Sequence, residues 1–222
     1  MPESQSHGFL LQDLLFTEIY GATTAELRAI PYTAELDLPG ALNRLEPGIP
    51  VSCKCTGNAN RVDMADCLRI FDGLLSATPY RVLVAVYRQD DAVPTKHITE
   101  LVEADLTSAT AELFGTVTRA EIVALDTAIK AVPRGRAPTV EEKAAIYALR
   151  DSLHAKTGAL QFAPKMDSKS QRRLQCSFNA FQHFLTAHPT RVIARGTPAA
   201  FRDRALSTAV ITSARRIRRL LK

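Results

Sequence analysis

The chain of 222 residues is long enough for one domain, or for a core with a small appendage. Apolar residues make up 46% and charged residues 23%, which is typical of globular proteins and excludes long disordered, collagen-like or coiled-coil stretches. The longest strongly apolar run, residues 82–87, is far shorter than the ~20 residues that cross a bilayer, so we expect no membrane segment. Because residues 1–7 lack the pattern of a secretory signal, we expect a cytoplasmic protein.

The N-terminal part of the chain shows helix and strand patterns in turn. Apolar residues at spacings of three and four predict a helix over residues 8–30, and polar–apolar alternation predicts a half-buried strand over residues 33–38. Residues 49–55 are predicted to form a second strand and residues 61–75 a helix. The β-branched run at residues 80–87 predicts a central strand that is covered on both faces. The expected order is therefore α, β, β, α, β.

The remainder of the chain is mainly helical in pattern. Helices are predicted over residues 107–114, 119–132 and 139–157. Residues 174–178 alternate as a strand would, and residues 201–222 predict a terminal helix. We therefore expect a mixed α/β (α+β) fold, with a central mixed β-sheet flanked by helices.

The four cysteines allow two interpretations. Cys53, Cys55 and Cys67 with a distant histidine could form a zinc site, but structural zinc sites usually have two-residue gaps between paired thiolates. Cys53 and Cys55 lie two residues apart in a predicted strand, so their side chains share one face. We therefore favour buried free thiols, a group that includes Cys176, over zinc ligands.

Charge is unevenly distributed along the chain. The formal net charge is +5, yet residues 165–222 hold 13 Lys and Arg against two Asp, a net charge of +11. The preceding residues carry a net charge of −6. A strongly basic C-terminal part favours a polyanionic partner, and nucleic acid is the most common one. A solvated basic helix face is the simpler alternative for the last ten residues.

Two predicted strands carry a group of residues suited to phosphodiester chemistry. Residues two apart in a strand share a face, so Glu35 lies with Asp37 in the first strand and Ser52 with Lys54 in the second. Carboxylates bind Mg²⁺ without removing all of its waters, and a lysine can orient the attacking water and offset developing charge. The alternative is a solvated edge strand in which Lys54 is the cross-strand partner of the two acids.

This arrangement resembles the PD-(D/E)XK nuclease superfamily, which includes many type II restriction endonucleases. The resemblance depends on Asp37, the fourteen residues that follow it, and then Ser52-Cys53-Lys54, a helix and a central strand. The resemblance covers residues 8–90 and implies that they form the catalytic core. Together with the helical pattern and the charge distribution, it leads us to expect a helical segment over 105–160 and a basic DNA-recognition segment over 161–222, within a single nuclease domain. It also implies a restriction-endonuclease-like core with a helical insertion and a basic C-terminal helix.

The resemblance implies catalytic and metal-binding roles for individual residues. Asp37 would bind Mg²⁺ and Lys54 would position the water, but Ser52 stands where an acid is expected. In some restriction enzymes the helix after the lysine strand supplies this acid, so Asp66 is the preferred replacement and Asp63 the second choice. Glu35 or Glu18 could complete the set of metal ligands. Asp63 and Asp66 could instead only favour the helix N-terminus electrostatically.

The basic C-terminal part supplies candidate DNA contacts. Arginine, lysine and glutamine are the residue types that bind phosphates and base edges in DNA. The candidates are Lys165, Lys169, Gln171, Arg172, Arg173, Gln175, Arg191 and Arg195. The two adjacent arginines, Arg172 and Arg173, could instead form ion pairs within the protein.

The sequence therefore predicts a Mg²⁺-dependent endonuclease, a hydrolase, that cleaves double-stranded DNA at specific sequences as a restriction enzyme does. A homodimer is expected by analogy, because a two-fold dimer cuts both strands of a symmetric site most simply. The alternative is a non-catalytic DNA-binding protein that uses the basic C-terminal region. A nuclease acting on RNA or branched DNA is a third possibility, and the sequence lacks the aromatic residues expected for single-strand stacking.

Overall fold

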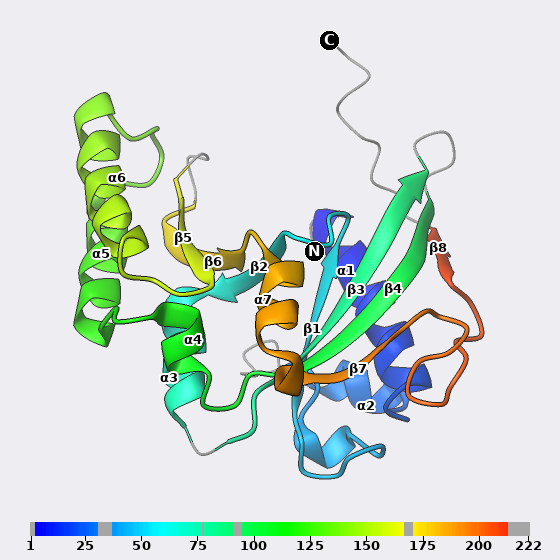
Figure 1. The fold of residues 1–222 in the computed structure, drawn as a ribbon. Coiled ribbons are helices and arrows are strands. Elements are labelled where there is room, and N and C mark those ends of the chain that lie inside the picture. The colour runs from blue at the N-terminus through cyan, green and yellow to red at the C-terminus, as the bar shows by residue number, and fades with distance from the viewer. Residues whose placement is uncertain (1–2, 31–36, 77, 91–94, 167–170, 213–222) are drawn as a thin grey trace. The chain divides into compact units, whose positions relative to one another are not determined.

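The computed structural model describes residues 3–30, 37–76, 78–90, 95–166 and 171–212. The content is mixed, with helices, a mixed sheet and a second, antiparallel sheet, so the predicted α+β class is confirmed (Figure 1). Contacts divide the chain into two compact units: unit 1 holds residues 1–59, 79–106 and 188–222, and unit 2 holds residues 60–78 and 107–187. No described helix combines the length and apolar character needed to cross a bilayer.

Unit 1 is built on a mixed sheet. Its strands are β1 (Val51–Thr56), β3 (Arg81–Asp90), β4 (Thr95–Asp105), β7 (Val192–Gly196) and β8 (Val210–Thr212). The order is β1-β3-β4-β7, and β8 also pairs with β4. β1 is parallel to β3, and the other pairs are antiparallel. β3 is an interior strand, as its apolar run predicted.

The helices of unit 1 come mainly from its first thirty residues. They are α1 (Glu3–Glu18), α2 (Thr24–Ala29) and the short 3-10 turns η1 (Gly40–Leu42) and η2 (Pro189–Arg191). α1 packs on one face of the sheet, where Leu15 and Phe16 join Cys53 and Leu83 in a single apolar core. This core orients β1, because burial of Val51 and Cys53 turns the residues between and after them to the opposite face.

Unit 2 combines a three-stranded antiparallel sheet with helices. Its elements are β2 (Val62–Asp66), α3 (Cys67–Leu75), α4 (Thr110–Phe114), α5 (Arg119–Ala131), α6 (Val140–His154), β5 (Leu160–Lys165), β6 (Arg173–Phe178) and α7 (Phe181–Ala187). The strand order is β2-β6-β5. Phe114 lies in the core with its ring centroid 5.0 Å from that of Phe71 and 6.2 Å from that of Phe162.

Several predicted elements differ from the structure. The helix predicted over residues 8–30 is two helices, because Gly21 adopts a φ of 78° between them. The helix predicted over residues 61–75 begins only at Cys67, after strand β2. Residues 201–212 form turns and β8 instead of a helix, while the rest of that prediction lies outside the described residues. The strand predicted over residues 33–38 is described only from Asp37 onward.

Sequence patterns missed the longest strand, β4, because Glu100 and Glu103 interrupt its apolar residues. The Glu103 side chain is fully buried on the α1 side of the sheet. Its carboxylate oxygens lie 2.9 Å from Arg202 Nη1 and 3.6 Å from Arg81 Nη1, and Arg202 Nη2 also contacts Glu46 at 2.8 Å. Burial raises the pKa of Glu103, while the two arginines oppose that shift.

The burial of Glu103 predicts a pH-dependent cost of removing Arg202. Arg202→Met should lower the free energy of unfolding by about 3 kcal/mol at neutral pH, since a buried carboxylate loses one of its two cations. The loss should shrink as the pH falls toward the ordinary pKa of glutamate, because the raised pKa of Glu103 then leaves the carboxyl protonated in the folded state. Urea unfolding of the wild-type protein and of Arg202→Met at several pH values measures this loss of unfolding free energy.

Arg204→Met is the matched control, because Arg204 lies in the same loop and is exposed, and its guanidinium forms no ion pair with a described residue but a 3.4 Å hydrogen bond to the Glu18 carbonyl. It should change the free energy of unfolding by less than about 0.5 kcal/mol. Equal losses in the two variants at every pH would contradict the role given to the buried pair.

Candidate active site

Asp37, Ser52 and Lys54 meet at the start of β1. The Asp37 Oδ2 atom accepts hydrogen bonds from Ser52 Oγ at 2.9 Å and from the Cys53 backbone N–H at 2.8 Å. Lys54 Nζ lies 3.4 Å from the same oxygen and donates to Ser52 Oγ at 2.6 Å and to the Cys53 carbonyl at 3.2 Å. One carboxylate oxygen therefore holds a hydroxyl, a backbone amide and an ammonium together.

Strand alternation and one bridge create this cluster. Leu38 pairs antiparallel with Val51 through two backbone hydrogen bonds of 2.9 Å, which places Asp37 beside the first residues of β1. Val51 and Cys53 face the apolar core, so Ser52 and Lys54 share the opposite face. The sequence prediction that these strands would bring Asp37, Ser52 and Lys54 together agrees with this geometry.

Among the described residues, the cluster has one carboxylate, and only one of its two oxygens is hydrogen-bonded. The Asp37 Oδ1 atom accepts no hydrogen bond from any described residue, and the Asp37 side chain is 31% exposed. Ser52 is neutral and almost fully buried, and the Lys54 side chain is 13% exposed. In the part of the chain that the structure describes, no three His, Cys, Asp or Glu side chains are grouped as a metal site.

The acids predicted to assist Asp37 within unit 1 have different outcomes. Glu35 lies outside the described residues. Glu18 lies at the end of α1, where its carboxylate accepts hydrogen bonds from the Ser207 backbone N–H at 2.5 Å and from the Ser207 hydroxyl. Glu18 therefore holds the segment before β8, and no hydrogen bond or ion pair joins it to Asp37.

The two acids predicted on a helix after β1 lie instead in β2 and at its end, and both belong to unit 2. The helical placement of Asp63 and Asp66 was wrong, because the alternating residues 62–66 pair with β6. Asp63 is exposed, with its carboxylate 3.7 Å from Arg61 Nε. Asp66 is the N-cap of α3, where its Oδ1 accepts from the Arg69 N–H at 2.9 Å. A metal-binding role for Asp66 stays a prediction.

None of the four cysteines, all of which lie in the described residues, forms a disulfide: Cys53, Cys67 and Cys176 are buried, and Cys55 is partly buried. Cys53 and Cys55 point to the same side of β1 and pack on its apolar core. A hydrogen bond with Cys55 and burial raise the pKa of Cys53 well above its usual value. In unit 2, Cys67 and Cys176 are fully buried beside each other, and their hydrogen bond and burial raise the pKa of Cys67.

The basic segment of unit 2 contains both exposed and buried candidates for DNA contact. Gln171 and Arg173 are exposed, and Lys165 and Gln175 are partly exposed on β5 and β6. Lys169 lies outside the described residues. Arg172 was wrongly predicted to be a DNA contact: it is 3% exposed, and its guanidinium donates to backbone carbonyls of the α5–α6 connection.

The candidates in unit 1 lie near β7. Arg191 is partly exposed in η2, and Arg195 is exposed on β7, where its Nε donates to Glu100 Oε1 at 2.5 Å. Sequence reasoning missed Glu100 as the partner of Arg195, because it did not predict strand β4. Had that strand been predicted, alternation would have placed Glu100 on the same face as Val102, the residue that pairs with Arg195. Arg195 keeps enough exposure for a phosphate contact that competes with Glu100.

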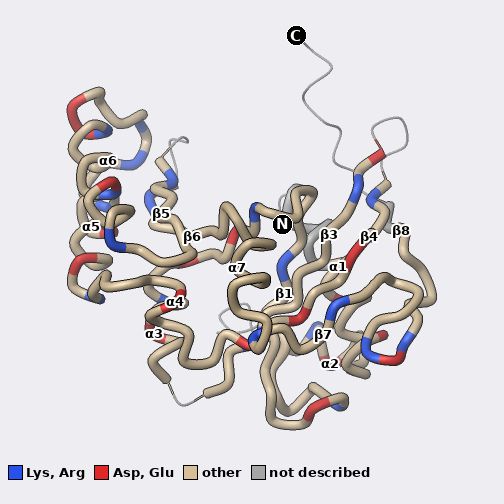
Figure 2. The backbone as a smooth tube through the Cα atoms, in the orientation of Figure 1, with Lys and Arg blue, Asp and Glu red and all other residues tan. Residues whose placement is uncertain are grey.

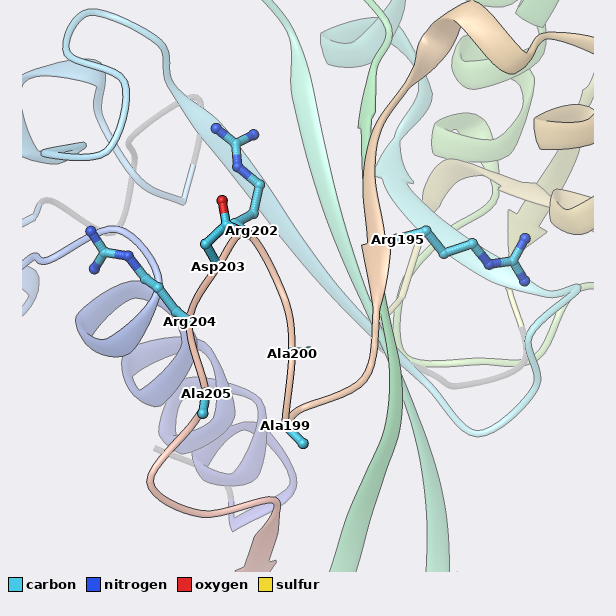
Figure 3. A pocket seen from close by; sticks show the side chains of 7 residues that line it. All are labelled: Arg195, Ala199, Ala200, Arg202, Asp203, Arg204 and Ala205. Atoms are coloured by element: carbon cyan, nitrogen blue, oxygen red, sulfur yellow. The ribbon is translucent and has the colours of Figure 1, made fainter.

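A pocket lies beside the loop that follows β7. It is lined by Arg195, Arg202, Asp203, Arg204 and three alanines, and Arg195 extends away from the other side chains (Figure 3). Each arginine already has a partner: Glu100 for Arg195, Glu46 and Glu103 for Arg202, and the Glu18 carbonyl for Arg204. The arginines of this pocket are therefore engaged in contacts within the protein, and we assign no ligand to the pocket.

Comparison with models of protein families, with curated proteins and with solved structures gives no match to this chain. The functional argument therefore depends on the geometry of Asp37, Ser52 and Lys54 and on the distribution of basic residues.

The hydrogen bonds to Asp37 predict a measurable contribution to stability. Asp37→Ala should lower the free energy of unfolding by about 1–3 kcal/mol, because the Cys53 N–H loses its acceptor and the Lys54 ammonium loses its carboxylate partner. Asp37→Asn should lower it less, since the amide oxygen can still accept from the Cys53 N–H. Asp63→Ala, which removes an exposed acid of β2, is the control and should cost less than about 0.5 kcal/mol. Urea denaturation measures both losses. Equal losses of unfolding free energy in Asp63→Ala and Asp37→Ala would contradict the stabilising role given to the Asp37 hydrogen bonds.

Proposed function

We propose that the protein is a Mg²⁺-dependent endonuclease that hydrolyses phosphodiester bonds of double-stranded DNA at specific sequences, as type II restriction enzymes do. The observation that carries the proposal is the convergence of Asp37, Ser52 and Lys54 around one carboxylate oxygen. The order that underlies the PD-(D/E)XK resemblance also supports it: Ser52 and Lys54 lie on β1, and α3 and the interior strand β3 follow, although strand β2 comes between β1 and α3.

The donor set fits a magnesium ion that keeps much of its water. Mg²⁺ in phosphoryl-transfer sites is commonly bound by one or two carboxylates together with substrate phosphate oxygens. Asp37 would hold it through Oδ1, which accepts no hydrogen bond from a described residue. The resemblance implies a second carboxylate, for which the sequence offers Asp66, with Asp63 as the second choice and Glu35 or Glu18 to assist. When bound, the ion supplies polarisation of the phosphate and a lower pKa of a coordinated water.

The remaining chemistry belongs to the side chains of β1. The Lys54 ammonium would orient the attacking water and offset charge that develops on the phosphate oxygens. Ser52 fixes Lys54 by accepting from its Nζ at 2.6 Å, so the lysine needs little reorganisation when substrate binds. The Cys53 N–H holds Asp37 Oδ2 at 2.8 Å and thereby fixes the orientation of the carboxylate.

The proposed substrate and assembly follow from charge and symmetry. Residues 165–222 carry a net charge of +11, which suits a polyanion. Lys165, Gln171, Arg173 and Gln175 in unit 2 would contact DNA, as would Arg191 and Arg195 in unit 1. A homodimer in the cytoplasm would present two such sites to a symmetric duplex.

A second candidate function is non-catalytic DNA binding through the basic C-terminal region. Two observations favour it: Ser52 replaces the acid that the resemblance implies, and the described residues contain no cluster of three metal ligands. This candidate predicts DNA binding with a steep salt dependence and no cleavage under any metal.

Plasmid cleavage tests the role of Lys54. Lys54→Ala should reduce the rate of Mg²⁺-dependent cleavage by at least about 100-fold, because a charge-stabilising group is lost, and should change DNA affinity by no more than a few-fold. Lys143→Ala, which removes an exposed cation of α6, is the control and should cleave normally. The wild-type protein should leave the plasmid intact in EDTA.

The outcomes separate the two candidates. Retained cleavage by Lys54→Ala would eliminate the proposed site. An intact plasmid with retarded mobility in wild-type protein and Mg²⁺ would favour the non-catalytic function.

A further inference from the structure

Two cations face each other across the β5–β6 hairpin. The antiparallel register pairs Lys165 directly with Arg173, so their side chains lie on the same face of the sheet. Neither side chain forms an ion pair with a described residue. Like charges directly opposite each other destabilise a strand pair, by about 0.2–1 kcal/mol. An anion bound between these two residues would turn this cost into a favourable interaction.

Arg172 brings a second basic segment to the same end of unit 2. Its guanidinium donates to the carbonyls of Val132 at 3.0 Å, Pro133 at 2.8 Å and Arg136 at 2.6 Å, all in the connection between α5 and α6. The connection is therefore held against the chain just before Arg173. Figure 2 shows basic residues both in this connection and at the adjoining end of the hairpin.

The connection presents one cation that has no partner among the described residues. Arg134 is exposed, and no hydrogen bond or ion pair joins it to a described residue. Arg136, in contrast, is paired through both terminal guanidinium nitrogens with Glu142, at 2.8 and 2.5 Å. Glu142 is already paired with Arg136, so Arg134 is a cation of this connection that has no such acidic partner among the described residues.

We propose that Arg134, Lys165 and Arg173 bind phosphates of duplex DNA, and that Arg172 is the positioning residue that holds the Arg134 loop beside the hairpin. The inference rests on the proposed function for the identity of the polyanion. Exposed, flexible cations from two segments suit backbone phosphates, which position a protein on DNA without reading its sequence. Arg134 was absent from the sequence-based candidates because it lies outside the basic C-terminal part.

The salt dependence of DNA binding tests the phosphate contacts. Binding of a fluorescent duplex to the full-length protein is measured in EDTA, where a metal-dependent nuclease does not cut, over a range of KCl concentrations. Arg134→Ala/Arg173→Ala should reduce the slope of log Kobs against log salt by about 2, because each lost phosphate contact contributes about 0.9. Lys143→Ala/Arg150→Ala is the matched control, since both cations lie over the Tyr147 ring on α6, and it should leave the slope unchanged.

A second variant separates positioning by Arg172 from a general structural role. Arg172→Met should reduce the slope by about 1, and adding Arg134→Ala to it should cause no further reduction, since the loop is already released. Adding Arg173→Ala should still lower the slope by about 1. Additive effects of Arg172→Met and Arg134→Ala would overturn the positioning role. Because Arg134→Ala/Arg173→Ala alters only exposed residues, it tests the phosphate contacts even if Arg172→Met fails to fold.

The remaining outcomes distinguish this inference from the nuclease proposal. An unchanged slope in Arg134→Ala/Arg173→Ala, with tight wild-type binding, would overturn the phosphate contacts whether or not the protein cleaves DNA. Full cleavage by Lys54→Ala, together with the expected reduction of the salt-dependence slope in Arg134→Ala/Arg173→Ala, would refute the proposed active site but support the phosphate contacts. A wild-type protein that binds vesicles of anionic lipid but no duplex would overturn the choice of DNA.

Discussion

The Asp37 carboxylate is the interaction on which the candidate site depends. A single oxygen, Oδ2, accepts from Ser52, from the Cys53 backbone and, at longer distance, from Lys54. Without it, the Lys54 ammonium would have only the Ser52 hydroxyl and a backbone carbonyl as acceptors. The same contacts leave Oδ1 without a partner among the described residues, so the carboxylate is fixed at one oxygen and open at the other.

Local periodicity was enough to predict the part of the fold that holds this carboxylate. The alternation in residues 49–55 placed Ser52 and Lys54 on one face of a strand, and the apolar run at residues 80–87 identified an interior strand. Strand β4 could not be predicted in the same way, because Glu103 looks like a surface residue. Its burial depends on Arg202, which is 99 residues away in the sequence, and no local pattern contains that pairing.

The basic region shows a similar limit of sequence reasoning. Composition identified an excess of positive charge after Lys165 but could not separate the functions of neighbouring arginines. Arg172 is buried because carbonyls 36 to 40 residues earlier in the chain satisfy its guanidinium, whereas Arg173 is exposed on β6. Acids were misplaced for a related reason: Asp63 and Asp66 were assigned to a helix because their strand becomes evident only through its pairing with β6.

Anomalous diffraction from crystals soaked in Mn²⁺, a substitute for Mg²⁺, would test the central claim most directly, because it locates a metal without requiring cleavage. The account predicts an anomalous peak about 2.0–2.2 Å from Asp37 Oδ1, at the distance of a coordinate bond, with Lys54 Nζ still hydrogen-bonded to Ser52 Oγ. The same crystals would identify any second carboxylate that binds the metal. Crystals with full Mn²⁺ exposure and no peak at Asp37 would contradict the account.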